Sequence, residues 1–191
     1  MRGRGSVSAV ALGNDRGFSL ERVVANMVVG SNGATSLHQD SAPLSPPEDR
    51  ERFHAIRGLA TSLVVGGKTY RCEHYSKAPL PVFVATRDLQ LLSQNSIPPG
   101  QSHFIRAEPA QVVAKALDSK GAIVLVEGGI SFIKPLLLAS IIDRLFLTRS
   151  PIAGDGDFFD FQMLNQNYQL DRSEDVGDVT FEEWIPKKGK S

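Results

Sequence analysis

Short hydrophobic runs alternate with stretches of helical periodicity along most of this chain. The runs are rich in valine and leucine and are bounded by polar residues or glycine, the pattern of buried β-strands. The segment 122–126 is purely apolar, as expected of a central parallel strand that is covered on both faces. The pattern predicts strands over 23–29, 62–65, 82–86, 103–106, 122–126 and 144–148.

Helical periodicity and end signals predict what lies between these strands. Ser45, followed by two prolines and Glu48, indicates a helix N-terminus with Ser45 as N-cap and Glu48 completing a capping box. We expect this helix to end near residues 58–60 and to bury Phe53, Ile56 and Leu59. A short helical turn and two longer helices should follow over 68–74, 108–119 and 132–140.

The pattern changes near residue 158. Two strand-like segments, 159–170 and 176–184, follow each other with no helix between them, and they should form an antiparallel pair. Alternating strands and helices with this ending predict an α/β fold whose central sheet is mostly parallel, with an antiparallel C-terminal edge. Ligands bind such sheets at the carboxyl ends of the strands, so candidate functional residues should follow the strands.

Two predicted strands end in paired glycines directly before a helix. Gly66-Gly67 follows one, and Gly128-Gly129 follows another, with Glu127 where the strand ends. Such junctions offer backbone N–H groups to an anion, although each alone is equally consistent with a tight turn, and Glu127 with a carboxylate that complements a helix dipole. Two junctions in one sheet favour a dinucleotide, even though neither matches a Walker A loop or the GxGxxG fingerprint.

Further polar residues accompany the strands. Asn26 interrupts an apolar strand, so its amide must find a hydrogen-bonding partner in a loop or a ligand. Thr86-Arg87 ends the strand over 82–86 and places a cation at the same edge, unless it is only a solvated turn. The four histidines show no metal-ligand spacing with carboxylates, and we expect no metal site.

Composition and charge narrow the class of protein. The 191 residues are 41% hydrophobic and include 21 basic and 21 acidic side chains, a balance that argues against binding nucleic acid or an anionic membrane. The single cysteine, Cys72, excludes an intrachain disulfide, and no apolar run approaches the length of a membrane span. We expect a cytoplasmic protein with one domain over 21–191, preceded by a disordered or loosely attached lead-in over 1–20.

Taken in order, these segments resemble the reductase domain of riboflavin biosynthesis, a pyrimidine reductase of the dihydrofolate-reductase-like superfamily. The resemblance implies that superfamily's three-layer sandwich and runs from about Val23 to Trp184. The motifs that carry it are VANMV at 24–28, VGGKTYRCE at 65–73, Thr86-Arg87, VEGG at 126–129, and DRL at 143–145 leading to Ser150-Pro151.

The resemblance also implies an activity. The family uses NADPH to reduce the ribosylamino side chain of a phosphorylated pyrimidine to a ribitylamino chain. By comparison with its members, we expect this chain to form a homodimer. On this mapping, the NADPH phosphates lie against Gly66, Gly67, Thr69, Gly128 and Gly129. The adenosine ribose and its 2′-phosphate lie near Thr86, Arg87 and Arg71. The substrate contacts are Asn26, Ser45 and Arg50, with Arg50 at the phosphate.

Two positions are candidate catalytic residues. Glu127 faces the substrate and the nicotinamide on this mapping. Asn32 stands where the family usually has the aspartate of a Ser-x-Asp-Gly motif, since this chain reads Gly-Ser-Asn-Gly at 30–33. An amide keeps the shape of aspartate but cannot carry charge or exchange a proton. We therefore expect weakened or redirected activity, and Asn32→Asp should raise turnover if the reductase is merely weakened.

The resemblance leaves alternatives open. Many relatives carry a zinc deaminase with His-x-Glu and Pro-Cys-x-x-Cys signatures, which one cysteine cannot supply, so a stand-alone reductase is expected. The alternatives are a reductase of another heterocycle, such as a pterin, and a non-catalytic homologue that keeps the nucleotide site. Dihydrofolate reductase itself is disfavoured because its pterin-binding acid is not evident between Ser45 and Leu59.

Overall fold

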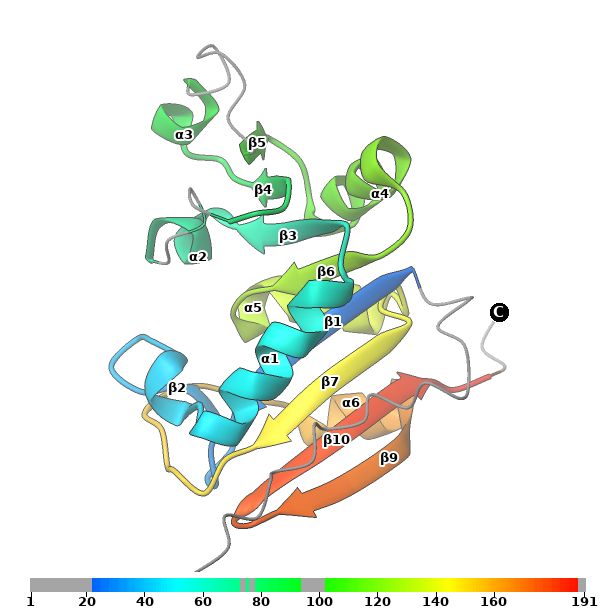
Figure 1. Ribbon diagram of the computed structural model, residues 1–191. Coiled ribbons are helices and arrows are strands. Elements are labelled where there is room, and N and C mark those ends of the chain that lie inside the picture. The colour runs from blue at the N-terminus through cyan, green and yellow to red at the C-terminus, as the bar shows by residue number, and fades with distance from the viewer. Residues whose placement is uncertain (1–21, 73–74, 76–77, 94–101, 189–191) are drawn as a thin grey trace, which may run out of the picture.

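The computed structural model describes residues 22–72, 75, 78–93 and 102–188. The predicted lead-in over 1–20 and the end of the predicted turn at 73–74 lie outside these ranges. Eight strands form one sheet in the order β5-β4-β3-β6-β1-β7-β10-β9 (Figure 1). Their bounds are β1 Val23–Val29, β3 Ser62–Gly66, β4 Val82–Ala85, β5 Ser102–Ile105, β6 Val124–Glu127, β7 Arg144–Arg149, β9 Tyr168–Val176 and β10 Val179–Pro186.

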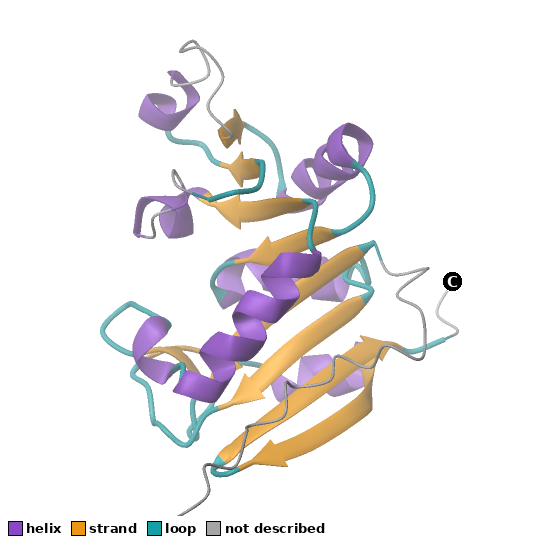
Figure 2. Ribbon diagram, viewed as in Figure 1, coloured by secondary structure: helices purple, strands orange, loops and turns teal. Residues whose placement is uncertain are grey.

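The strand directions confirm the predicted sheet. Neighbouring strands from β5 to β7 run parallel, whereas β10 runs antiparallel to both β7 and β9. Helices cover both faces and produce three layers (Figure 2). One face carries α1 (Pro47–Leu59), α2 (Gly67–Cys72) and α3 (Leu89–Ser93), and the other carries α4 (Pro109–Lys120), α5 (Ile130–Leu138) and α6 (Phe161–Asn167).

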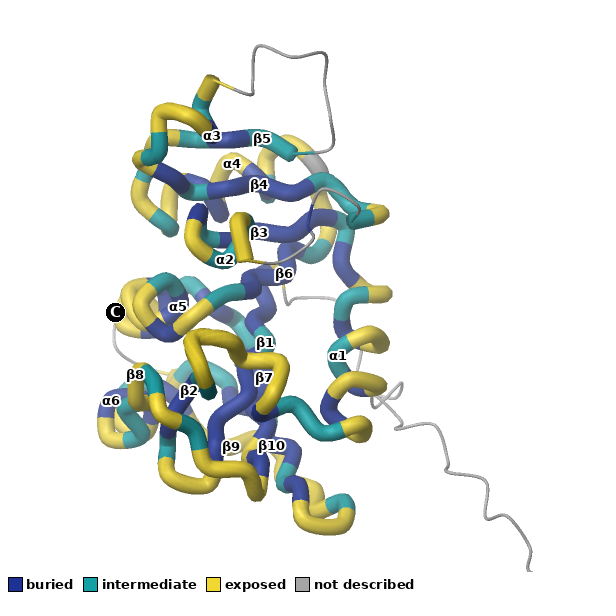
Figure 3. Tube along the Cα trace, turned by 90° about the vertical axis from the view of Figure 1, so that its left-hand side faces the viewer, coloured by how far each residue is buried: buried dark blue, intermediate teal, exposed yellow. Residues whose placement is uncertain are grey.

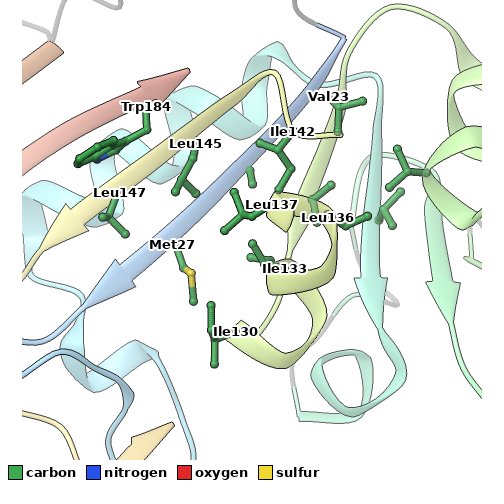
Figure 4. Close-up of a cluster of buried hydrophobic side chains, with 14 of the residues drawn as sticks. Val23, Met27, Ile130, Ile133, Leu136, Leu137, Ile142, Leu145, Leu147 and Trp184 are labelled. Atoms are coloured by element: carbon green, nitrogen blue, oxygen red, sulfur yellow. The ribbon is translucent and has the colours of Figure 1, made fainter. Parts of the chain in front are cut away.

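Alternation of side chains along the strands divides the core into two clusters. On β1, Ala25 and Met27 pack with α4, α5 and α6, whereas Val24 packs on the side of α1. Figure 4 shows the larger cluster, where Ile130 and Ile133 of α5 lie toward Met27 of β1. Because the central strands are buried on both sides (Figure 3), their sequences are nearly continuous apolar runs.

The strand predicted over 159–170 was wrong for residues 159–167. Residues 161–167 form α6, and β9 begins only at Tyr168. The carboxylate of Asp160 caps this helix by accepting a hydrogen bond from the Met163 N–H at 2.9 Å. Met163 and Leu164 are buried in the larger core cluster, so helical burial outweighs the aromatic, strand-like composition of the segment.

The start of α1 also differs from the prediction. Pro46, rather than Ser45, occupies the N-cap position, and no side chain caps the helix. A residue before proline avoids the helical region, so the two prolines force Ser45 and Pro46 to be extended and delay the helix to Pro47. Along the helix Ile56 is buried as predicted, whereas Leu59 is 40% exposed.

A second, two-stranded sheet was not predicted. It pairs β2 (Ala34–Ser36) with β8 (Gly156–Phe158), and the short helix η1 (Ala42–Leu44) follows β2. This small sheet brings the segment after β1 against the segment after β7. It therefore stands near the carboxyl ends of β1 and β7, which are neighbours in the large sheet.

Candidate functional site

A cavity of about 990 Å³ lies at the carboxyl ends of the parallel strands. Residues at the ends of β3, β4 and β6 form one wall, together with Asn26 and Val28 of β1. The first turns of α1 and α2, the start of α5 and the small β2–β8 sheet complete it. The position is the one expected for ligand binding in an open α/β sheet.

Nine of the predicted site residues meet at this cavity, and four do not. The nine that line it are Asn26, Ser45, Arg50, Gly66, Gly67, Thr69, Glu127, Gly128 and Gly129. Within the described residues, the cavity wall does not include Asn32, Arg71, Thr86 or Arg87.

Packing within the protein explains three of the four glycines. A Cβ at Gly67 would lie 2.7 Å from Thr86 Oγ1, and one at Gly66 would lie 3.3 Å from the Phe132 ring. Gly128 has a φ of +145°, and a Cβ there would lie 3.3 Å from Thr69 Oγ1. Gly129 differs, because a Cβ there would meet no atom within 4 Å. Of the four junction glycines, Gly129 is the one that adjoins open space.

The Glu127 carboxylate is engaged by the protein. It is 3% exposed and accepts two hydrogen bonds from Arg57 of α1, at 2.9 and 2.5 Å, and one from the Tyr75 hydroxyl at 2.6 Å. This bidentate pair fixes α1 to the end of β6. The helix-dipole interpretation of Glu127 is thus replaced by an ion pair with a residue 70 positions away.

Asn26 extends from β1 beside this ion pair. Its neighbour Ala25 pairs with Val126, so Asn26 lies level with Glu127 across the β1–β6 ladder. Its Oδ1 atom is buried and receives no hydrogen bond from the described part of the protein. A buried amide oxygen is normally satisfied, so the open acceptor marks a place where a ligand or water donor fits.

Asn32 joins two loops. Its Nδ2 donates to the Gly154 carbonyl at 2.8 Å, and its Oδ1 accepts from the Gly154 and Ala34 N–H groups at 3.1 and 3.2 Å. The amide thus uses a donor as well as an acceptor, which a carboxylate could not do. The geometry gives Asn32 a structural task, and its catalytic role stays a prediction.

Asp49 is a site residue that the sequence did not reveal. It lines the cavity from the first turn of α1, is 3% exposed, and its Oδ2 accepts a hydrogen bond from the Ser45 hydroxyl. Its Oδ1 is buried without a partner in the described structure. The signal was a Ser-to-acid spacing of four rather than three residues, which the apparent capping box with Glu48 concealed.

Arg52 belongs to the same helix, α1, and lies about one turn after Asp49. It is 3% exposed, and its guanidinium lies 4.7 and 5.3 Å from the ring centroids of Phe181 and Phe146. Burial lowers the pKa of Arg52, while the charges of Glu183 and Asp49 act in the opposite direction. Arg52 therefore places positive charge behind Asp49.

The basic residues predicted or found near the cavity differ in whether they form ion pairs with described residues. Arg71 pairs with Asp88 at 2.8 Å, and Arg87 with Glu108 at 2.7 Å, both outside the cavity wall. Arg50 and Lys68 line the cavity, are exposed, and make no ion pair with any described residue. The cations available to an anionic ligand in the cavity are thus Arg50 and Lys68 rather than Arg71 and Arg87.

The described residues show neither a group of metal ligands nor a membrane-spanning helix. Within the described ranges, no three His, Cys, Asp or Glu side chains are grouped as metal ligands. Of the described helices, none has the length and apolar character that crossing a bilayer requires.

The sequence matches no protein-family model and no curated protein, but the structure is similar to solved structures. A diaminohydroxyphosphoribosylaminopyrimidine deaminase/5-amino-6-(5-phosphoribosylamino)uracil reductase from Thermotoga maritima has a TM-score of 0.69 and 13% identity over 87% of this chain. This chain spans 57% of that protein's length.

Two other solved structures are matched over nearly their whole length. A pyrimidine reductase-like protein from Corynebacterium diphtheriae gives a TM-score of 0.65 at 18% identity, covering 90% of this chain and 94% of that one. Dihydrofolate reductase from Enterococcus faecalis, complexed with NADP(H) and RAB-propyl, gives 0.62 at 17%, covering 87% and 97%.

Together, the layers, the strand order and these likenesses define an α/β three-layer sandwich with its cavity at the carboxyl ends of the strands. The chain has the dihydrofolate-reductase-like fold. The sequence resemblance implied this fold, and the structural neighbours include the pyrimidine reductases that it pointed to.

Proposed function

We propose that this protein is an NADPH-dependent reductase that converts the ribosylamino side chain of a phosphorylated pyrimidine into a ribitylamino chain. The observation that carries the proposal is one cavity wall that combines both glycine junctions with Asn26, whose Oδ1 has no described partner, and with two cations that pair with no described residue. The names of the neighbours support it, because two are described as pyrimidine reductase proteins and a third is complexed with NADP(H).

The residues present fit a nicotinamide dinucleotide. Gly129 adjoins open space at the start of α5, where backbone N–H groups are available to a phosphate. Lys68 supplies a positive charge at the neighbouring junction, and no described residue forms an ion pair with it. When bound, NADPH would supply the hydride, and the protein's part is to hold and orient the reactants. On this proposal the 2′-phosphate relies on Lys68, because Arg87 and Arg71 are already paired.

The opposite side of the cavity fits the substrate. Arg50 is an exposed cation of α1 that forms no ion pair within the described part of the chain, and a guanidinium binds phosphate through two parallel hydrogen bonds. Asn26 and Ser45 also line the cavity and contribute polar groups to it. A homodimer, which the resemblance implies, and a cytoplasmic location, which the composition favours, are also part of the proposal.

A second candidate function has its own supporting observation. Both residues predicted to be catalytic have protein partners: Glu127 binds Arg57 and Tyr75, and Asn32 binds Gly154. A protein that binds the nucleotide without reducing a substrate would tolerate this arrangement. Binding and turnover must therefore be measured separately.

Substitution of Gly129 tests the cofactor site. Gly129 has φ −69° and ψ 165°, which any residue adopts, and both Asn and Asp suit its N-cap position. If phosphate binds there, Gly129→Asn should weaken NADPH binding by roughly tenfold through lost contact, and Gly129→Asp should weaken it further through charge repulsion. Fluorescence quenching at one salt concentration measures both dissociation constants.

Gly58 provides the matched control. It lies on α1 outside the cavity wall, and a Cβ there would meet no atom within 4 Å. Gly58→Asp should leave NADPH binding unchanged while adding the same charge. Equal affinities for wild type, Gly129→Asn and Gly129→Asp would refute the assignment.

A further inference from the structure

A buried arginine on α1 is only partly satisfied by its surroundings. Arg52 is 3% exposed, and its guanidinium lies over the rings of Phe146 and Phe181. Its Nη2 atom lies 3.7 Å from Glu183 Oε1 and donates a long hydrogen bond, 3.5 Å, to the Glu182 carbonyl. Its Nη1 atom is buried and has no hydrogen-bond partner in the described structure. Because a buried charge without a close counter-charge is costly, Arg52 is drawn to any carboxylate that it can reach.

Two carboxylates lie near enough for their charges to act on Arg52, those of Glu183 and Asp49. Glu183 belongs to β10 and pairs with Phe146 of β7, which in turn pairs with Asn26 of β1. These three residues form a row on the face of the sheet that α1 covers. Asp49 lies three positions before Arg52 on α1, a spacing that brings two side chains together on a helix. Glu183 thus approaches Arg52 from the sheet, and Asp49 approaches it along the helix.

The observed arrangement leaves Asp49 with an open acceptor. Its Oδ2 atom accepts from the Ser45 hydroxyl, but its Oδ1 atom is buried and has no partner among the described residues. A salt bridge from Arg52 Nη1 to Asp49 Oδ1 would satisfy both open atoms at once. Arg52 is turned toward Glu183 instead, so the Oδ1 atom stays available to a hydrogen-bond donor in the cavity.

We infer that Glu183 is a positioning residue for the cavity: its charge holds Arg52 away from Asp49 and so keeps the Asp49 carboxylate open to a ligand. Glu183 itself is not among the described residues of the cavity wall. Arg144 donates to Glu183 Oε2 at 2.7 Å and fixes it in place. Without the charge of Glu183, the guanidinium turns to Asp49 and occupies its acceptor from behind. The inference rests on the proposed function for the choice of ligand, whereas the contacts that it concerns lie within the protein.

Removal of the charge at position 183 provides the test. The probe is 2,5,6-triaminopyrimidin-4-one, a free ring of the proposed substrate class that carries several N–H donors. It is titrated calorimetrically into the full chain with NADPH present and absent. Glu183→Gln should weaken binding of the ring by about tenfold, because the ring then competes with Arg52 for Asp49. The affinity for NADPH should stay unchanged.

A second substitution separates positioning from structural damage. Arg52→Met, added to Glu183→Gln, removes the competing guanidinium and should restore the affinity for the ring. Methionine adapts to irregular spaces beside aromatic rings, and replacement of a buried ion pair by apolar residues is tolerated in other proteins. A merely structural role of Glu183 would not be rescued in this way, since a second buried substitution would add to the damage.

Glu182→Gln is the matched control. Glu182 is the neighbouring residue on β10, and its carboxylate binds Arg149 and Trp184 on the opposite face of the sheet. This variant loses the same charge from the same strand but should keep the affinity for the ring. Unfolding midpoints show which variants are folded. If Glu183→Gln is not, Glu183→Asp takes its place, since the shorter carboxylate retreats from Arg52 and should also weaken binding of the ring.

A crystal structure of the Glu183→Gln variant provides a reading that needs no ligand. The Arg52 guanidinium should lie against Asp49 Oδ1, and a guanidinium in its original position would overturn the inference.

Each outcome of the titrations decides the inference. Unchanged affinity for the ring in folded Glu183→Gln, equal weakening in Glu182→Gln, or no recovery in the double variant would overturn it, and so would a wild type that does not bind the ring. The proposed function fails separately. A protein that does not bind NADPH, but whose affinity for the ring still depends on Glu183, would contradict the reductase and support the role of Glu183.

Discussion

The polar residues in and near the cavity wall fall into two groups, those whose polar atoms are satisfied by described residues and those with an atom or a charge that has no described partner. Glu127 and Asn32 belong to the first, and Asp49, Arg50 and Lys68 to the second. The sequence located Glu127 and Asn32 correctly after their strands, but it could not show their partners. Arg57 and Gly154 lie 70 and 122 residues away, and only the folded chain brings them together.

The clamp between Asn32 and Gly154 changes the expectation for Asn32→Asp. Aspartate cannot donate to the Gly154 carbonyl and would place negative charge against it. We now expect a loss of about 1 kcal/mol in the free energy of unfolding and no gain in turnover. Urea unfolding together with steady-state NADPH oxidation measures both. A faster enzyme of unchanged stability would restore a catalytic role for position 32.

Among the elements, the central strands were the most predictable and the short or capped ones the least. Strand β1 was predicted at its exact bounds, because burial on both faces leaves an uninterrupted apolar run. The two-stranded sheet of β2 and β8 was missed, since strands of three residues show no periodicity. Helix α6 was missed because its N-cap, Asp160, lies among aromatic residues that favour a strand.

The Asp160 cap makes part of the stability of α6 depend on pH. The hydrogen bond from the Met163 N–H holds the pKa of Asp160 below its usual value, with help from nearby Lys134. Because the folded pKa is the lower one, the carboxylate stabilises the protein above its unfolded pKa and loses this effect as pH falls through the folded pKa.

Wild type should therefore exceed Asp160→Asn in stability at about pH 7, and the difference should shrink towards about pH 3. Thermal unfolding of both variants across this range provides the measurement. A difference that is constant with pH would show that the charge of Asp160 contributes nothing to the cap.

In the whole molecule, the alternation of strands and helices predicts a mostly parallel sheet with an antiparallel edge, whereas it does not predict the contacts of the side chains in the cavity. The sheet places residues from β1, β3 and β6 at one edge, as the sequence predicted. Which face each side chain takes, and which charges cancel, depends on contacts that span most of the chain. For this reason Arg87 and Arg71 were predicted at the cofactor but lie outside the cavity wall.

The measurement that most directly tests the central claim is hydride transfer. NADPH carrying deuterium at the reactive carbon is incubated with the full chain and the ribosylamino-diaminopyrimidinone phosphate, and the product is analysed by mass spectrometry. We predict a ribitylamino product that carries one deuterium from the cofactor. Tight binding of NADPH with no deuterium in any product, from this substrate or its uracil counterpart, would contradict a reductase and favour a nucleotide-binding protein without catalysis.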